Sequence, residues 1–169
     1  MKKLLVVLVV LACFTVGAFA GSNQFTITAQ VNSSIAIALS GTWAVGAKDA
    51  SSTATMVLTN GIAVTNTSTV ACSIVASVAN SGSWVADSSA AENKYVLKLA
   101  AYKTANIPAS DGALATALGS ASAVAGSANL ELGALDLSNG SVFAQLQLPS
   151  KSTSAASQTI TVTVTAGAL

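Results

Sequence analysis

Apolar and polar residues alternate along much of this chain, and the alternation is cleanest over residues 24–31. Phe25, Ile27, Ala29 and Val31 share one side of this segment, and only glutamine and threonine occupy the other. A period of two predicts a β-strand with one buried face. Similar patterns predict strands over residues 34–39, 42–45, 53–59, 62–66, 69–78, 95–102, 130–133, 135–138, 141–148 and 158–166.

A tight turn is predicted at Asn139-Gly140, because this dipeptide tolerates the positive φ values of a type I′ turn. The resulting hairpin would pair residues 135–138 with residues 141–144. In that register one face is apolar and the other is polar, with Phe143 as the only large apolar exception. The pattern therefore predicts a half-buried antiparallel sheet.

The same signal at Asn60-Gly61 predicts a second hairpin, between residues 53–59 and 62–66. Both faces of this hairpin carry apolar residues. We therefore expect it either at the centre of a sandwich or with one face against another subunit.

Two further local signals interrupt the strand pattern. Ser110 or Asp111 is expected to cap a short helix that carries Leu114 and Leu118. The leucines before and after Gly133 are out of phase, which predicts a β-bulge near this glycine.

With the segments before and after Gly133 counted as one bulged strand, we expect eight to ten short strands, with turn signals every eight to twelve residues. This pattern is typical of an all-β fold, and we expect an antiparallel β-sandwich of immunoglobulin-like or jelly-roll-like type. Residues 21–169 are expected to form this single domain, after a signal-peptide helix within residues 1–20.

The first twenty residues predict export. Lys2 and Lys3 give a basic start, residues 4–12 form an apolar run, and Ala18 and Ala20 fit a signal cleavage site. The apolar run is too short for a membrane span. We therefore expect a secreted protein, extracellular or at the cell surface, after periplasmic transit.

The two cysteines predict no disulfide within the secreted domain. A lipoprotein signal at Cys13 is an alternative to the cleavage above, but Leu11 stands where a small residue is usual. Cys72 alternates with apolar neighbours, so we expect a small buried side chain. An intermolecular disulfide or a reactive thiol is the alternative for Cys72.

Charge and residue type exclude several classes of function. The chain has seven basic residues, all lysines, with six acidic residues and no histidine. No basic patch is present for nucleic acid, and no Ser-His-Asp triad or histidine zinc site can form. The carboxylates are scattered through predicted turns and polar faces. We therefore expect a protein that is not an enzyme and holds no cofactor or metal.

Several polar residues are expected to have simple surface roles. Asn32, Asn66 and Asn139 lie in glycosylation sequons at predicted turns, and we expect turn residues unless the host glycosylates them. The last strand carries a row of threonines expected to face solvent, with contact to a polymer, a carbohydrate or ice as alternatives: Thr159, Thr161, Thr163 and Thr165.

Residues 62–74, IAVTNTSTVACSI, resemble a VTNTG-containing strand pair of immunoglobulin-like modules in bacterial surface and secreted proteins. The succession of Trp43, Trp84, YVL at residues 95–97 and QTITVTV at residues 158–164 is similar to small secreted single-domain surface proteins of environmental bacteria. The plan is also similar to that of biofilm-matrix fibre subunits and strand-exchanging pilins. The resemblance implies an immunoglobulin-like sandwich with a structural role, and it carries over no binding residues.

From these observations we expect a structural subunit of an extracellular fibre, pilus or surface layer. Residues 24–31 could complete the sheet of a neighbouring copy by β-strand addition, with Phe25, Ile27, Ala29 and Val31 as plugs. The partner is then a second copy in a homopolymer. The alternatives are that this strand pairs within its own domain, or that the protein is a monomeric carbohydrate- or surface-binding module.

Overall fold

The computed structural model describes residues 34–79, 82–124, 130–135 and 139–169. These residues all belong to one of the two units into which the chain divides, Asn32–Leu169. The described part is mostly β and contains ten strands: β1 (Ile37–Ser40), β2 (Thr53–Thr55), β3 (Ile62–Asn66), β4 (Cys72–Ala79), β5 (Val85–Ala86), β6 (Lys94–Lys103), β7 (Ala123–Val124), β8 (Leu130–Leu135), β9 (Gly140–Gln147) and β10 (Thr161–Ala168). Its helices are η1 (Leu58–Asn60), η2 (Thr104–Asn106) and α2 (Asp111–Ser120).

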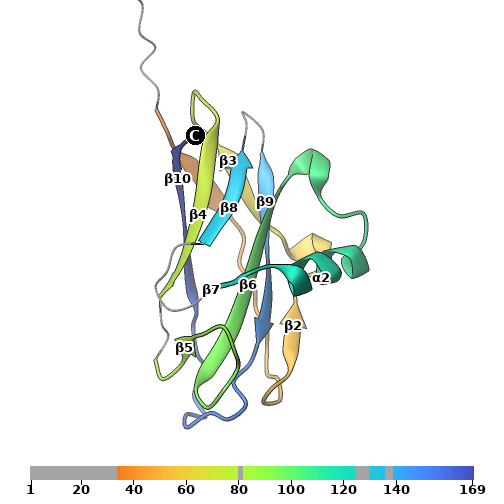
Figure 1. Ribbon diagram of the computed structural model, residues 1–169, viewed down its shortest axis with the longest axis vertical. Coiled ribbons are helices and arrows are strands. Elements are labelled where there is room, and N and C mark those ends of the chain that lie inside the picture. The colour runs from red at the N-terminus through yellow and green to blue at the C-terminus, as the bar shows by residue number, and fades with distance from the viewer. Residues whose placement is uncertain (1–33, 80–81, 125–129, 136–138) are drawn as a thin grey trace, which may run out of the picture. The chain divides into compact units, whose positions relative to one another are not determined.

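The larger sheet has the strand order β1-β3-β9-β6-β5, with β2 added to β9 and β7 added to β6 (Figure 1). Strand β9 lies in its middle. One edge of β9 pairs with β6, from Gly140 opposite Lys103 to Gln147 opposite Val96, and β3 and β2 share the other edge. The described pairs in this sheet are antiparallel, except the short parallel pair of β5 with β6.

The smaller sheet has the order β10-β4-β8. Strand β10 pairs antiparallel with β4, from Thr161 opposite Ala79 to Ala168 opposite Cys72. The register of β4 with β8 shifts beside Gly133, which has a φ of 98°. The predicted bulge is therefore confirmed, and its backbone conformation favours glycine.

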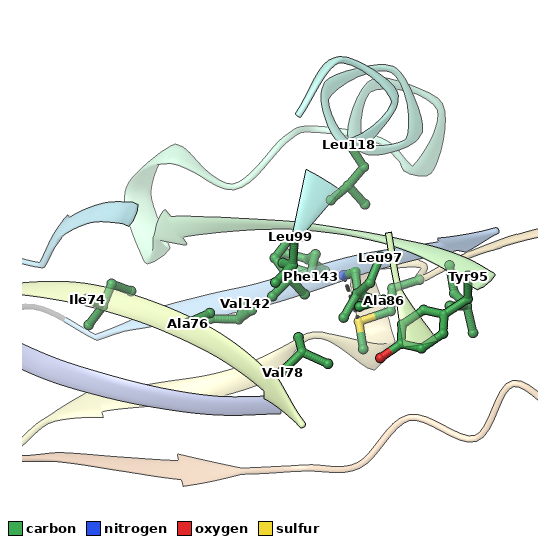
Figure 2. Packing of buried hydrophobic residues seen from close by; sticks show 14 of the residues in the cluster. Ile74, Ala76, Val78, Ala86, Tyr95, Leu97, Leu99, Leu118, Val142 and Phe143 are labelled. Carbon is green, nitrogen blue, oxygen red and sulfur yellow. Dashed lines mark hydrogen bonds between the residues drawn. The ribbon is translucent and has the colours of Figure 1, made fainter. Parts of the chain in front are cut away.

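The two sheets pack face to face around one apolar cluster, as an all-β sandwich requires (Figure 2). Alternate residues of β4 form one side of it, and Cys72, Ile74 and Ala76 are fully buried. Leu97 and Leu99 of β6 lie on the opposite side. Cys72 is a buried unpaired thiol, as predicted.

Helix α2 packs on β6 and β9 of the larger sheet. The Ala113 N–H donates a hydrogen bond to the Ser110 hydroxyl at 3.2 Å, so Ser110 is the predicted N-cap. Leu114 and Leu118 lie one turn apart and are fully buried. Figure 2 shows Leu118 pointing from the helix toward the sheet.

The hairpin predicted at Asn139-Gly140 is wrong. Strand β8 pairs with β4 in the smaller sheet, whereas β9 belongs to the larger one. Gly140 also lacks the positive φ that a type I′ turn requires. The local turn preference is outweighed because β9 gains partners along both edges. Phe143 is also buried, at 1% exposure, with its ring 6.1 Å from that of Tyr102.

The hairpin predicted at Asn60-Gly61 is also wrong. Strands β2 and β3 pair with the same edge of β9 and not with each other. Gly61 has a φ of −57°, which any residue adopts. However, a Cβ on Gly61 would lie 2.5 Å from Phe143 Cε1. This glycine therefore allows the close approach of an aromatic ring instead of forming a turn.

The structure bears on three further features of the chain. Residues 42–45 form no strand, and Trp43 there is half-buried against the core cluster. The predicted strand over residues 24–31, the signal-peptide helix and Asn32 lie outside the described residues. None of the helices within the described ranges has the length and apolar character needed to cross a membrane.

Candidate functional site: an apolar groove beside strand β10

A large apolar groove lies between the two sheets, beside β10. Its volume is about 1050 Å³. Its walls come from β9, β6, β10 and the loop over residues 41–50, and include Val142, Ala144, Leu146, Leu97, Leu99, Ile160, Val162 and Val164. Protein interiors have few voids larger than a water molecule. The space beside β10 is therefore much larger than a completed core leaves open.

The groove follows the strand direction. On the β9 side its lining extends from Val142 to Leu148, a length of about 20 Å at roughly 3.3 Å per residue. On the other side it extends from Ile160 to Val164 along β10. This length accommodates about six or seven residues of extended chain.

Among the described strands, β10 is a long edge strand without the usual protection. Among the described strands it pairs only with β4, and in such an edge strand alternate N–H and C=O groups point away from the partner. Its sequence, TVTVTAGA, has no charge and no proline, and its pairing with β4 has no bulge. Natural edge strands normally carry a charge, a proline or a bulge, which prevents pairing with another strand. The other described edge strands are short, as in β1 and β5, or bulged, as in β8.

The two faces of β10 differ in chemistry. Thr161, Thr163 and Thr165 are exposed, as predicted, on the outer face of the smaller sheet. Val162 and Val164 are half-buried and line the groove. Strand β10 thus alternates threonine outside with an apolar residue inside, which is the pattern also seen in residues 24–31.

Both tryptophans form part of the groove wall. Trp43 and Trp84 are half-buried and pack against the core cluster. Trp84 Nε1 donates a hydrogen bond to Ser152 Oγ at 2.9 Å, and its ring lies 6.5 Å from that of Tyr95. Tyr95 is fully buried, and its hydroxyl has no hydrogen-bond partner within the described ranges. These contacts fix Trp84 in the wall of the groove.

Few charges lie at the groove. Lys48 is the only charged residue that lines it in the part of the chain that the structure describes. Elsewhere, Lys94 Nζ lies 2.8 Å from Asp87 Oδ2, and this contact and the Ser88 N–H lower the pKa of Asp87 to about 2. In the described segments, no three His, Cys, Asp or Glu side chains gather as they would for a metal ion. The groove therefore presents a neutral and apolar surface.

The described chain begins at one end of the sandwich. The Ser34 N–H donates to Thr69 Oγ1 at 3.2 Å, and the Ser34 carbonyl accepts from the Thr69 N–H at 3.1 Å. Thr69 leads into β4, whose first residue, Cys72, lies opposite Ala168 at the end of β10. Figure 1 shows the start of the described chain and the C-terminus at the same end. Ser34 is therefore anchored where β10 ends.

The residues singled out in the sequence have different outcomes. Phe25, Ile27, Ala29, Val31, Ala18 and Ala20 lie outside the described residues. Asn66 is a turn residue, since its Oδ1 accepts a hydrogen bond from the Ser68 N–H at 2.8 Å. The groove was not predicted, because its walls are far apart in the sequence; the signal that points to it is the neutral, unprotected last strand.

No family model, curated protein or solved structure matches this chain.

Proposed function

We propose that this protein is a secreted structural subunit with an immunoglobulin-like sandwich, which assembles into an extracellular fibre, pilus or surface layer. Residues 24–31 of one copy add to the β10 edge of another copy, and their apolar side chains fill its groove. The observation that carries this proposal is the coincidence of an apolar groove of about 1050 Å³ with a long unprotected edge strand. An extended amphipathic segment would fill the groove with its apolar side chains and pair with the edge strand through its backbone.

Residues 24–31 match the groove in length and chemistry. The seven residues from Phe25 to Val31 span about 20 Å when extended, against roughly 20 Å for the groove. Phe25, Ile27, Ala29 and Val31 enter the groove, and each of the three larger side chains contributes about 1.5–3 kcal/mol when fully buried. The alternate threonines and glutamines then continue the hydroxyl-rich outer face of β10.

Charge also favours this partner. Residues 21–31, GSNQFTITAQV, contain no charged side chain, and the groove lining contains only Lys48 among the described residues. A neutral strand therefore enters without burying an unpaired charge, which would be costly.

Electron microscopy of the full chain, exported from a bacterial host, tests the proposal. Two aspartate variants form a matched pair: Ile27→Asp places a carboxylate on the inward side of the strand, and Thr28→Asp places one on the outward side. We expect filaments from the parent and from Thr28→Asp, and none from Ile27→Asp or from a chain lacking residues 24–31. Dispersed, folded particles from the parent over a wide concentration range would overturn the proposal.

The competing function is a monomeric carbohydrate- or surface-binding module. The positions of Trp43 and Trp84 at the groove favour it, because aromatic rings pack against apolar ligand faces. Binding to a panel of glycans by particles that never assemble, lost in Trp43→Ala, would replace the structural role with this one.

A further inference from the structure

We propose that Asn60 is a site of spontaneous covalent modification, where the side-chain amide converts to aspartate and isoaspartate, and that the fold protects Asn139 from the same reaction. Both residues precede a glycine, and both are exposed. The local sequence therefore makes the two sites equally reactive, and the sheet distinguishes them. Both sites belong to the folded domain, so their difference does not depend on the proposed assembly.

Asparagine before glycine is reactive because glycine has no Cβ to obstruct its backbone nitrogen. That nitrogen attacks the asparagine Cγ, an N–Cγ bond forms, the Cγ–Nδ2 bond breaks, and the side-chain amide leaves as ammonia with the proton of the glycine N–H. Water then opens the succinimide ring at either carbonyl, which gives aspartate or isoaspartate. The reaction consumes only water, but it requires a peptide that can turn and a glycine N–H that is not held by the sheet.

Gly140 is held within the sheet. The Asn139 carbonyl accepts hydrogen bonds from the Thr104 N–H at 3.0 Å and from Thr104 Oγ1 at 2.9 Å. Since successive residues of a strand direct their backbone groups to opposite edges, Gly140 directs its N–H away from β6 and toward β3, where it lies opposite Val64. Gly140 is also buried. Ring closure at Asn139 must therefore disrupt contacts on both edges of β9.

Gly61 lies just before β3 and outside the ladder. In the same alternation, Ile62 directs its backbone groups toward β9, so Gly61 directs its own toward the other edge of β3. The described pairs on that edge end with Ala63 opposite Ser40, and they do not reach Gly61. Within the described ranges, the Gly61 N–H thus has no partner strand, and ring closure at Asn60 leaves the sheet intact.

The turn that contains Asn60 is short. Helix η1 has three residues, and none of them is buried. Its start is held by the Leu58 N–H, which donates to Asp111 Oδ1 at 2.7 Å. At its end, the Asn60 N–H donates to the Val57 carbonyl at 2.9 Å. Opening this exposed turn costs less free energy than opening the buried ladder around Asn139.

The product has a structural effect because of its position. Isoaspartate adds a methylene to the main chain directly before Gly61. The backbone at Gly61 is confined, since a Cβ there would lie 2.5 Å from Phe143 Cε1. The next residue, Ile62, packs against the core cluster and lines the groove. Closely packed interiors respond to changes of a single methylene, so conversion at Asn60 should destabilise the start of β3.

The test is a timed incubation of the full exported chain at mildly alkaline pH, both folded and in concentrated urea. Digestion after lysine separates the sites, since residues 49–94 contain Asn60 and residues 104–151 contain Asn139. Mass spectrometry measures conversion to the acid, and enzymatic methylation detects isoaspartate. In the folded chain Asn60 should convert at least about ten-fold faster than Asn139, a difference of about 1.4 kcal/mol in activation free energy. In urea the two rates should be similar.

Asn60→Gln and Asn139→Gln form a matched pair of variants. Each keeps the amide and adds one methylene to the side chain, which slows ring closure. Incubation in the folded state should lower the urea midpoint of the parent and of Asn139→Gln, and leave that of Asn60→Gln unchanged.

Three results would overturn the inference. The first is equal conversion of Asn60 and Asn139 in the folded chain, because the ladder would then give no protection. The second is an Asn60 that converts in urea and not in the folded chain. The third is an equal loss of stability in Asn60→Gln and the parent. Filament formation is measured separately, so each of these results leaves the proposed function as it stands.

Discussion

Replacing Gly61 with alanine tests whether the Phe143 ring is what requires glycine at this position. The backbone at Gly61 has φ −57° and ψ 136°, which alanine adopts without strain. A Cβ there would lie 2.5 Å from Phe143 Cε1 and 2.7 Å from Cζ, whereas carbon atoms pack at about 3.5–4.0 Å. The ring is confined, since Phe143 is buried and packs on Tyr102.

The expected change in the free energy of unfolding depends on whether the Phe143 ring is present. In the parent, Gly61→Ala should lower the free energy of unfolding by about 1–3 kcal/mol, the usual cost of overpacking a core. In a Phe143→Leu background, the same change should raise it by about 0.4–1 kcal/mol, because alanine restricts the unfolded chain at a compatible backbone position. The two sites should therefore be coupled by about 1.4–4 kcal/mol.

Urea unfolding of the parent, both single variants and the double variant measures this coupling. The half-buried Trp43 and Trp84 provide the fluorescence signal, and circular dichroism reports the sheets independently. An equal loss of stability on Gly61→Ala in both backgrounds would refute the reasoning. That result would mean that the local backbone requires glycine, as in the hairpin turn first predicted at Asn60-Gly61.

Two further substitutions probe the two groups whose pKa values are shifted in the folded protein. Asp87 has its pKa lowered to about 2 by Lys94 and the Ser88 N–H, so its stabilising effect is complete above its unfolded pKa of about 3.9 and is lost as pH falls through 2. The melting temperature of Asp87→Asn should be below that of the parent at pH 6 and converge with it near pH 2; a constant difference would contradict this. Tyr95→Phe removes a buried hydroxyl that has no hydrogen-bond partner among the described residues and whose pKa is raised by burial. Urea unfolding should therefore show no loss of stability, and a loss above about 1 kcal/mol would reveal a hydrogen bond.

Features that depend on a few neighbouring residues could be predicted from the sequence. The alternation of apolar residues located β4 and β6, and the phase change among the leucines located the bulge at Gly133. The hydroxyl of Ser110 marked the start of α2 for the same reason, since a cap is made within four residues. Each of these signals is generated by contacts inside one element.

Strand partners could not be predicted in this way. Asn-Gly favours a tight turn, but β9 obtains a complete ladder on each edge from β6 and from β3 with β2. One residue did signal this outcome. Phe143 lies on the otherwise polar face of the predicted hairpin, and it is buried on the side where α2 packs. An apolar residue on an otherwise polar face of a strand thus indicates that another element, here α2, covers that face.

The placement of charge along the chain argues for a paired β10. Three lysines lie in β6, at Lys94, Lys98 and Lys103, and the edge of β6 away from β9 is paired, among the described strands, only by the short β5 and β7. None lies in Thr161–Ala168, the long edge where a single lysine would prevent uncontrolled pairing. An edge that is unbulged, neutral and apolar on its inner face makes a monomer prone to aggregation. It is the expected composition of an edge that receives a strand, and residues 24–31 supply a neutral strand with the matching alternation.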